Sequence, residues 1–328
     1  MTALPAIDEL TVSIIAIDRP VYLQQAVASL FPTTPAGATL QITLNACGAD
    51  TRGVADAALA RWRGPTRRLT LERRLNFAQA HNFALREVQT EFVNFMGDDD
   101  VNLEPKLLRQ LRLFENEDVL AVGTFARRVG GRPGGPLRSK GYMDVGPTSV
   151  EEMRRQLECD QPIHLVFPSV VVRTKAIRDV GGFREVFGPA ADVDLWTRLA
   201  ERGTVLAIPE RLFGFRVHDE SGSSRQFFEA RHLVRYAQSC LAARQRGLVE
   251  PTLAEYERSR GGLPTRVRRR LEDVSRYNFR KAGAAWLEQR YLSSLTRVAV
   301  SFVASPVECL RKVAEQSGIQ FRSGADRG

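Results

Sequence analysis

Three consecutive carboxylates, Asp98, Asp99 and Asp100, follow an apolar segment at residues 91–96 and a single glycine. Adjacent carboxylates repel one another, so they need a cation or several hydrogen-bond donors. Mg²⁺ and Mn²⁺ prefer oxygen ligands and typically also bind substrate phosphates. The alternative is an acidic turn in which one aspartate caps the following helix. The triplet therefore indicates either a divalent-metal site or a helix start.

Two later positions also carry residue types that can do chemistry. Asp192 and Asp194 open a helix-like segment, where an aspartate either favours the helix dipole or serves as a general base toward a hydroxyl. Arg216 and His218 follow an apolar strand-like segment. A histidine in such a place is either structural or a metal ligand.

Strand-like and helix-like segments alternate through the first part of the chain. This alternation predicts an α/β fold with a mainly parallel sheet and helices on both faces. Ligands of such sheets bind beyond the carboxyl ends of the strands, which is where the triplet would stand. The expected strands are 11–17, 40–45, 68–73, 91–96, 119–124, 163–172 and 204–208; the expected helices are 20–30, 53–62, 76–88, 103–114, 149–157 and 190–203.

Two stretches interrupt this pattern. Residues 127–146 are rich in Gly, Pro and Arg and predict a long loop, either a lid over a site or a disordered segment. From residue 226 onward the pattern is almost purely helical, with breaks near 247–251, 261–264 and 306. We therefore expect a first domain at residues 1–224 and an α-helical C-terminal region at 225–328.

The positive charge is concentrated in that C-terminal region. The chain has a net charge of +9, and residues 225–328 contain 20 Lys and Arg against 10 Asp and Glu. A basic region of this kind binds nucleic acid or anionic lipid, or is a solvated helical surface. The four cysteines are far apart in sequence, and no apolar stretch of about 20 residues is present. We expect a soluble protein of the reducing cytoplasm.

The motifs resemble, in order, those of the family 2 glycosyltransferases of GT-A fold, over residues 11–224. The opening VSIIAIDRPVYLQQAVASL resembles the first strand and helix of that family. Asn45 stands where the family often has an acidic residue that reads the base. LNFAQAHNFAL keeps Asn76 and Asn82 of a segment beside the nucleotide. The centre of the opening motif, usually Thr-Tyr-Asn-Arg, is here Ala16, Ile17, Asp18 and Arg19.

NFMGDDD resembles the DxD element that holds the divalent ion and the donor diphosphate. The resemblance implies that Asp98 and Asp100 are metal ligands and that Asp98 and Asp99 contact the nucleotide sugar. FRVHDESGSS resembles the closing Arg-x-His segment. This places Arg216 beside the diphosphate and His218 at the metal.

PAADVDLWTRLAERG resembles the family's Glu-Asp-x-Asp-Leu-Trp helix, in which the aspartate after the glutamate is the catalytic base. By this correspondence Asp192 is the base, and Ala191 replaces the glutamate. Asp194 is then expected to orient the helix.

The resemblance implies an inverting glycosyltransferase that depends on Mn²⁺ or Mg²⁺. It would move a sugar from a nucleotide-diphosphate sugar to an acceptor hydroxyl of a glycan, a lipid-linked molecule or a small molecule, in polysaccharide, glycolipid or glycan biosynthesis. Two alternatives stay open. One is a nucleotidyltransferase, although IAIDRP lacks the Gly-rich basic loop of such enzymes. The other is a nonenzymatic nucleotide- or nucleic-acid-binding module that uses the basic tail.

The tail itself favours other partners than nucleic acid, because exposed aromatics among its bases are sparse. Near its end, apolar residues stand beside Arg297, Arg311 and Lys312. A helix with an apolar face and basic flanks lies on an anionic membrane without crossing it, here the inner face of the cytoplasmic membrane. The competing interpretation is a helical hairpin that packs on the catalytic domain or on a second subunit, which would make a homo-oligomer.

Overall fold

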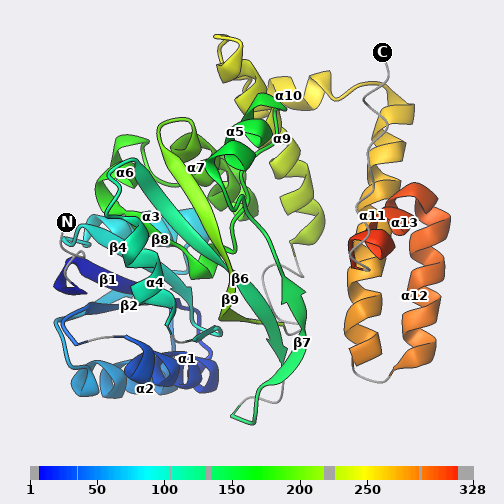
Figure 1. The fold of residues 1–328 in the computed structure, drawn as a ribbon. Coiled ribbons are helices and arrows are strands. Elements are labelled where there is room, and N and C mark those ends of the chain that lie inside the picture. The colour runs from blue at the N-terminus through cyan, green and yellow to red at the C-terminus, as the bar shows by residue number, and fades with distance from the viewer. Residues whose placement is uncertain are drawn as a thin grey trace. The chain divides into compact units, whose positions relative to one another are not determined.

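The computed structural model describes residues 7–34, 36–103, 105–130, 134–217, 226–287 and 290–316. The chain divides into two compact units, Met1–Glu250 and Pro251–Gly328 (Figure 1). The first unit contains the sheet and its covering helices, and the second is helical. Each unit is considered by itself below.

Within the described residues, the first unit has one nine-stranded mixed sheet. The strands are β1 (Leu10–Ala16), β2 (Thr39–Asn45), β3 (Thr66–Leu71), β4 (Phe92–Gly97), β5 (Val101–Asn102), β6 (Val119–Gly130), β7 (Arg138–Met143), β8 (Val171–Arg173) and β9 (Thr204–Arg216). Their order is β3-β2-β1-β4-β8-β6-β9-β5, with β7 paired to β6. Strands β1 to β4 pair in parallel, as do β6 and β9, which confirms the expected mainly parallel sheet.

Helices cover this sheet. They are α1 (Pro20–Thr33), α2 (Ala49–Arg61), α3 (Phe77–Arg86), α4 (Lys106–Leu113), α5 (Val150–Glu158), α6 (Thr174–Asp179), α7 (Ala191–Ala200) and α9 (Phe227–Gln245). Short 3₁₀ turns are η1 (Ile7–Glu9), η2 (Phe167–Ser169) and η3 (Glu185–Ala190). Every residue of β1 and β2 is buried. In β2 one face is apolar, and the other bears the buried polar side chains Gln41, Thr43 and Asn45.

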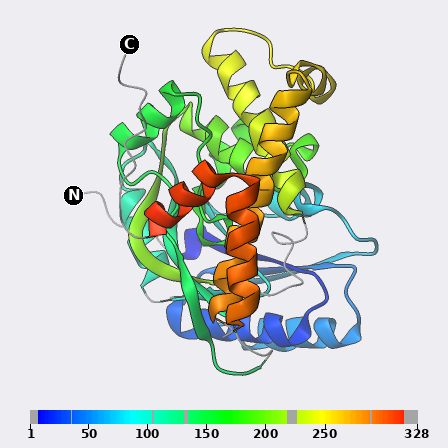
Figure 2. The ribbon, with the colours of Figure 1, turned by 90° about the vertical axis from the view of Figure 1, so that its right-hand side faces the viewer.

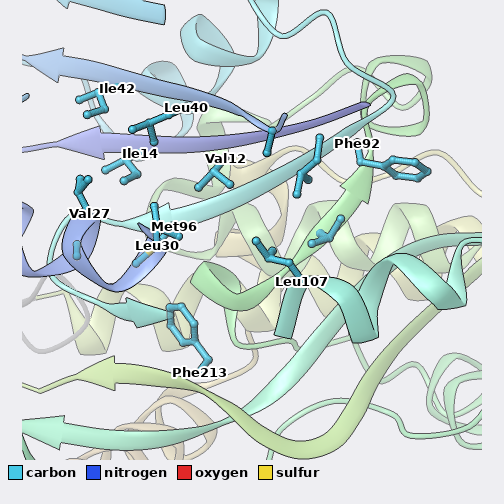
Figure 3. Packing of buried hydrophobic residues seen from close by; sticks show 14 of the residues in the cluster. Val12, Ile14, Val27, Leu30, Leu40, Ile42, Phe92, Met96, Leu107 and Phe213 are labelled. Atoms are coloured by element: carbon cyan, nitrogen blue, oxygen red, sulfur yellow. The ribbon is translucent and has the colours of Figure 1, made fainter. Parts of the chain in front are cut away.

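The two faces of β1 pack on different helices. Successive side chains of a strand point to opposite faces, so Ile14 and Ile15 belong to different clusters. Ile14 packs with Val27 and Leu30 of α1, and Figure 3 shows these side chains close together. Ile15 packs with Ala80 of α3 on the other face. The sheet thus lies between α1 on one face and α3 on the other.

The loop expected at residues 127–146 is in large part a pair of strands. β6 continues to Gly130, and β7 pairs with it in antiparallel register. β6 also pairs with β9 along its other edge, from Val119 to Val129. Backbone hydrogen bonds on both sides thus stabilise a segment whose Gly, Pro and Arg content predicts a loop. Residues 131–133 of the expected loop lie outside the described residues.

The first unit ends later than expected, at Glu250 and not at residue 224. The reason is that α9 packs on η3 and α7. The ring of Tyr236 stacks on Phe187 with centroids 4.8 Å apart, and Arg244 forms an ion pair with Glu201 at 2.7 Å. The change to a purely helical pattern therefore begins inside the first unit.

The second unit contains α10 (Leu253–Ser259), α11 (Leu263–Leu287), α12 (Tyr291–Ala304) and α13 (Pro306–Gln316). This confirms the expected helical C-terminal region. α11 and α12 run antiparallel side by side (Figure 1), and α13, in red, leaves the end of α12 at a sharp angle (Figure 2). Among the described helices of the chain, none has the length and apolar character to cross a membrane.

Candidate active site

Three loop segments bring acidic and basic side chains together at one edge of the sheet. β1 and β4 are parallel neighbours, with Ile15 opposite Gly97, so the residues that follow them leave at the same edge. β9 reaches this edge because Gly214 pairs with Val101 of β5. We call the residues gathered there the carboxylate–arginine cluster; they are Arg19, Asp98, Asp99, Asp100 and Arg216.

Arg19 bridges two of the carboxylates. Its Nη2 lies 2.8 Å from Oδ1 of Asp98, and its Nη1 donates to Oδ2 of Asp99 at 2.5 Å. The other oxygen of Asp98 accepts a hydrogen bond of 2.8 Å from the backbone N–H of Ile17. Ala16, at the end of β1, is fully buried. Asp98 therefore ties the loop after β1 to the loop after β4.

Arg216 holds the other side of the cluster. Its backbone N–H donates to Oδ1 of Asp100 at 2.8 Å, and its Nε donates to the carbonyl oxygen of Asp99 at 2.5 Å. Gln25 accepts from Nη2 at 3.0 Å. The remaining Nη1 is buried and has no hydrogen-bond partner among the described residues. A buried guanidinium nitrogen normally has an acceptor, and a phosphate oxygen suits arginine well.

The carboxylates of the cluster fit a divalent cation. Burial, followed by the neighbouring charge of Asp99, raises the pKa of Asp100 well above its usual range, so a cation beside this carboxyl would favour its ionised form. A Cβ built on Gly97 would lie 2.4 Å from Oδ2 of Asp100 and 3.0 Å from Oδ1 of Asp99. Both oxygens thus approach the same point over Gly97, which only glycine leaves open. Two carboxylates with water and phosphate as further ligands are typical of Mg²⁺ sites.

Protein ligands do not by themselves complete a metal site here. Within the described ranges, no group of three or more His, Cys, Asp and Glu side chains is arranged to hold a metal ion. His218, the further ligand that the motif implies, lies outside the described residues. The metal roles of Asp98, Asp100 and His218 therefore stay predictions.

Asp192 and Asp194 stand two residues apart in the first turns of α7 but have different surroundings. Asp194 is buried and accepts hydrogen bonds from Arg184 Nε at 3.0 Å and from Arg198 Nε at 2.9 Å. It therefore fixes the helix. Asp192 is half-buried, and burial raises its pKa to about 6, against the opposing effect of the Val193 backbone N–H. A carboxyl with this pKa can accept a proton near neutral pH.

Aromatic rings connect α7 with the strand that bears the carboxylates. The ring of Phe167 stacks on Phe95 of β4 with centroids 5.5 Å apart and on Trp196 of α7 at 6.1 Å. His81 packs edge-on against Phe167 at 5.0 Å, and burial lowers its pKa to about 4, so its ring is neutral. Phe95 precedes Asp98 by three residues in β4. This packing fixes the helix of Asp192 relative to the carboxylates.

Asp18 and Asn45 do not reach the cluster; each holds a neighbouring loop. Asp18 adopts a left-handed backbone conformation (φ 69°), and its Oδ1 accepts from Gly48 N and Thr51 Oγ1, both at 2.9 Å. These hydrogen bonds lower its pKa. Asn45 donates to the carbonyl of Leu75 at 3.0 Å and accepts from its N–H at 2.8 Å. These contacts hold neighbouring loops, and the nucleotide-binding roles of Asp18 and Asn45 stay predictions.

Asn76 and Asn82 also bond to the protein itself. Asn76 caps α3 and forms a capping box with Gln79. Asn82 binds the backbone of Phe183, donating to its oxygen at 2.7 Å and accepting from its N–H at 2.9 Å. Gly182 must be glycine, because φ is +71° and a Cβ would lie 2.7 Å from Oδ1 of Asn82. Asn82 thus holds the segment that leads into η3 and α7.

Two residues of the site were not predicted from the sequence. Tyr22 lies with its ring 4.8 Å from the guanidinium carbon of Arg216, and Gln25 accepts from the same side chain. Tyr22 and Gln25 are three residues apart on α1 and so share one face of the helix. Arg19, Tyr22 and Gln25 are thus spaced by three residues each. This spacing could have placed Tyr22 and Gln25 on the same side as Arg19 from the sequence alone.

The fold and site define a glycosyltransferase of GT-A type. The family model described as glycosyl transferase family 2 matches residues 11–181. The chain belongs to that family and is a glycosyltransferase. This replaces the two alternatives, a nucleotidyltransferase and a nonenzymatic binding module.

Solved structures share the fold at low sequence identity. Mannosyltransferase PcManGT from Pyrobaculum calidifontis, in complex with GDP-Man and Mn²⁺, is 12% identical with a TM-score of 0.54, over 94% of this chain and 79% of that chain. Residues 1–349 of TarS from S. aureus are 14% identical with a TM-score of 0.51, over 95% and 93% of the two chains. No curated protein matches the sequence.

Proposed function

We propose that the protein is an inverting, metal-dependent glycosyltransferase that moves a sugar from a nucleotide-diphosphate sugar to an acceptor hydroxyl. One observation carries this proposal. The carboxyl of Asp192 is half-buried and has a pKa of about 6. Aromatic packing fixes its helix relative to β4. The carboxylate–arginine cluster lies at the carboxyl end of β4. The similar PcManGT was solved with GDP-Man and Mn²⁺, which supports the donor class and the metal.

The donor diphosphate binds at the cluster in this proposal. Asp99 and Asp100 would hold Mn²⁺ or Mg²⁺ through the oxygens that lie around the same point over Gly97. Asp98, which the motif implies as a ligand instead of Asp99, would keep the loop in place. Its two oxygens are on Ile17 and Arg19. When bound, the ion neutralises the charge of the leaving diphosphate. Arg216 directs its buried Nη1 to a diphosphate oxygen.

Asp192 is the general base. It takes the proton of the acceptor hydroxyl while that oxygen attacks the anomeric carbon. The bond from this carbon to the diphosphate oxygen breaks on the opposite face, and its electron pair leaves with the nucleotide diphosphate. A single displacement of this kind inverts the anomeric configuration. The acceptor is a hydroxyl of a glycan, a lipid-linked molecule or a small molecule, in polysaccharide, glycolipid or glycan biosynthesis.

A donor panel tests the proposal. The purified chain is incubated with GDP- and UDP-sugars, with Mn²⁺, Mg²⁺ or EDTA, and release of the nucleotide diphosphate is measured. NMR of the product gives the anomeric configuration. We expect turnover that EDTA removes and an inverted product. Retention of configuration, or full turnover in EDTA, would contradict the mechanism.

Asp192→Asn is the variant that isolates the base. Donor affinity should stay the same while turnover falls about 10²-fold or more, as expected for loss of a general base. Asp50→Asn is the matched control, because Asp50 is an exposed aspartate in the first turn of α2. Equal turnover in the two variants would remove Asp192 from the mechanism.

A further inference from the structure

The inner seam of the α11–α12 pair is lined by small side chains. Ser275 and Ala282 of α11 meet Ser301 and Ser294 of α12, at a spacing of seven residues on each helix. Ser294 Oγ donates to the carbonyl of Ala282 at 2.9 Å, and Ser301 Oγ donates to that of Ser275 at 2.9 Å. Both α12 serines are buried. The seam therefore holds the helices by close approach and hydrogen bonds and buries few large apolar side chains.

The outer face of α12 has the opposite character. Leu292 and Val303 are exposed by 81% and 82%, and Leu295 and Phe302 are also exposed. Residues at these spacings form one stripe along a helix. The only charged residue in the sequence of α12 is Arg297. Apolar surface that forms a continuous stripe marks a contact surface, and the polar seam shows that this stripe is not the one that holds the hairpin together.

Apolar surface continues at both ends of the hairpin. At the turn, Trp286 and Tyr291 are exposed and their ring centroids lie 5.0 Å apart. Such rings, apolar with a polar tip, favour the interface between lipid and water. At the other end, Leu263 and Val267 line an open groove together with Pro306. The groove is formed by the start of α11 and the junction of α12 with α13, at the end of the pair opposite the turn.

The net charge of the second unit indicates which kind of partner this apolar surface contacts. Residues 251–328 contain 15 Lys and Arg against 8 Asp and Glu, a balance of +7. Two copies of such a unit repel each other, whereas an anionic lipid surface attracts each base that approaches it. Arg268, at the edge of the groove, has a side chain that is 72% exposed. The combination of apolar stripe and basic surroundings favours anionic lipid over a second copy.

We propose that the second unit binds the surface of an anionic membrane through the outer stripe of α12 and the aromatic pair at the turn. The hairpin lies in the headgroup region with its stripe facing the acyl chains, as amphipathic helices do. It does not cross the bilayer, because no described helix is long and apolar enough. This interaction is separate from the transfer reaction, so its test does not depend on the proposed function.

Vesicle flotation of the full chain tests this proposal. Vesicles of phosphatidylcholine alone and of phosphatidylcholine mixed with phosphatidylglycerol are compared at about 0.01 M and about 1 M salt, where the Debye length is about 30 Å and about 3 Å. We expect the chain to float with the phosphatidylglycerol vesicles at low salt. Binding should be much weaker with phosphatidylcholine alone and should fall at high salt.

A double variant isolates the apolar stripe. Leu292→Gln with Val303→Gln should lower vesicle affinity about tenfold or more, because two large apolar side chains no longer enter the lipid. Both residues face outward, so circular dichroism and the melting temperature should not change. The matched control is Leu248→Gln with Val249→Gln, a pair exposed by 63% and 93% in the first unit. This control should float like the unchanged chain.

Three results would overturn the proposal. One is no flotation with phosphatidylglycerol vesicles at low salt. Another is an equal loss of affinity in the control pair. The third is a dimer, seen by light scattering, that Leu292→Gln with Val303→Gln dissociates while vesicles bind no protein; this would assign the stripe to a second copy.

Discussion

Arg19 Nη2 lies 2.8 Å from Oδ1 of Asp98, and this ion pair joins the loop after β1 to the loop after β4. The side chain of Asp98 is 2% exposed and that of Arg19 is 15% exposed. Before any donor binds, a cation of the protein itself therefore compensates part of the negative charge at the sheet edge. The pair therefore holds these two loops together through the protein's own side chains.

Arg19→Gln should lower the melting temperature without divalent ions, because it leaves Asp98 buried without its ion pair. Breaking a buried pair costs about 3–5 kcal/mol, and the partial exposure of Arg19 favours the lower end of this range. Added Mn²⁺ should raise the melting temperature of the variant more than that of the unchanged chain, since the ion compensates the extra charge. Thermal unfolding with and without Mn²⁺ measures both effects. Equal Mn²⁺ shifts would show that Arg19 and the ion act on different carboxylates.

The control for this variant is Arg109→Gln. Arg109 forms an ion pair of 2.8 Å with Glu210, and both side chains are well exposed. Exposed pairs contribute about 0–1 kcal/mol, so this variant should melt close to the unchanged chain at either Mn²⁺ concentration.

Asp100→Asn should remove Mn²⁺-dependent donor binding without loss of stability. Burial and the charge of Asp99 raise the pKa of Asp100, so a neutral amide relieves repulsion. Its oxygen can still accept from the backbone N–H of Arg216. Calorimetric titration with the nucleotide sugar and Mn²⁺, together with thermal unfolding, checks this prediction. An unchanged affinity for the nucleotide sugar with Mn²⁺ would show that Asp100 is not a metal ligand.

Asp194→Asn should destabilise the protein by about 3–5 kcal/mol, because it breaks a buried network and leaves Arg184 and Arg198 without their shared carboxylate. Asp192→Asn should leave the free energy of unfolding the same or higher, since burial of the Asp192 carboxyl is unfavourable. Urea denaturation of the two variants compares them directly. A larger loss of unfolding free energy for Asp192→Asn would mean that Asp192 holds the helix and that Asp194 is the base.

The pH profile gives a further check on Asp192. Burial raises its pKa to about 6 from the usual 3.8, and a base must be ionised to accept a proton. In the unchanged chain kcat should therefore fall as the pH decreases through about 6. The residual activity of Asp192→Asn should not show this decrease at low pH. If the variant shows the same decrease near pH 6, the decrease comes from another group.

The sequence predicted the parts of the site that depend on local pattern. The buried strand before Asp98 and the helix that begins near Asp192 follow from apolar spacing, and a parallel sheet brings strand ends to one edge. The place of Arg216 near these carboxylates was implied by the resemblance to the family's closing Arg-x-His segment. The helical pattern from residue 226 onward likewise predicted the helices found there.

The sequence did not predict which side chains the protein uses internally. Asn45 and Asn82 bind the backbones of Leu75 and Phe183, far away in the chain. Residue type does not predict these partners, because nearly every residue has the same backbone donor and acceptor. The extension of β6 through Arg127 and Val129 depends likewise on pairing with β9. Long-range backbone pairing thus overrode the local loop composition.

Lys106, the first residue of α4, is fully buried. Its Nζ lies 3.3 Å from Oδ1 of Asn94 and 3.3 Å from the carbonyl oxygen of Ser169. Burial lowers its pKa to about 7 from the usual 10.5. Between these values the unfolded chain binds more protons than the folded one, so the free energy of unfolding should rise with pH from about 7 to about 10.

Lys106→Met should remove this rise and stabilise the protein at pH 7 by about 1–2 kcal/mol, because an apolar side chain of similar length has no charge to desolvate. Gln110 still donates to the Ser169 carbonyl at 2.8 Å, so the oxygen stays hydrogen-bonded. Lys175→Met is the control, since the Lys175 side chain is 85% exposed and should leave the slope unchanged. Urea denaturation at several pH values between 7 and 9 measures the slopes. If Lys106→Met retained the slope of the unchanged chain, the pH dependence would come from another group and Lys106 would be charged in the folded protein.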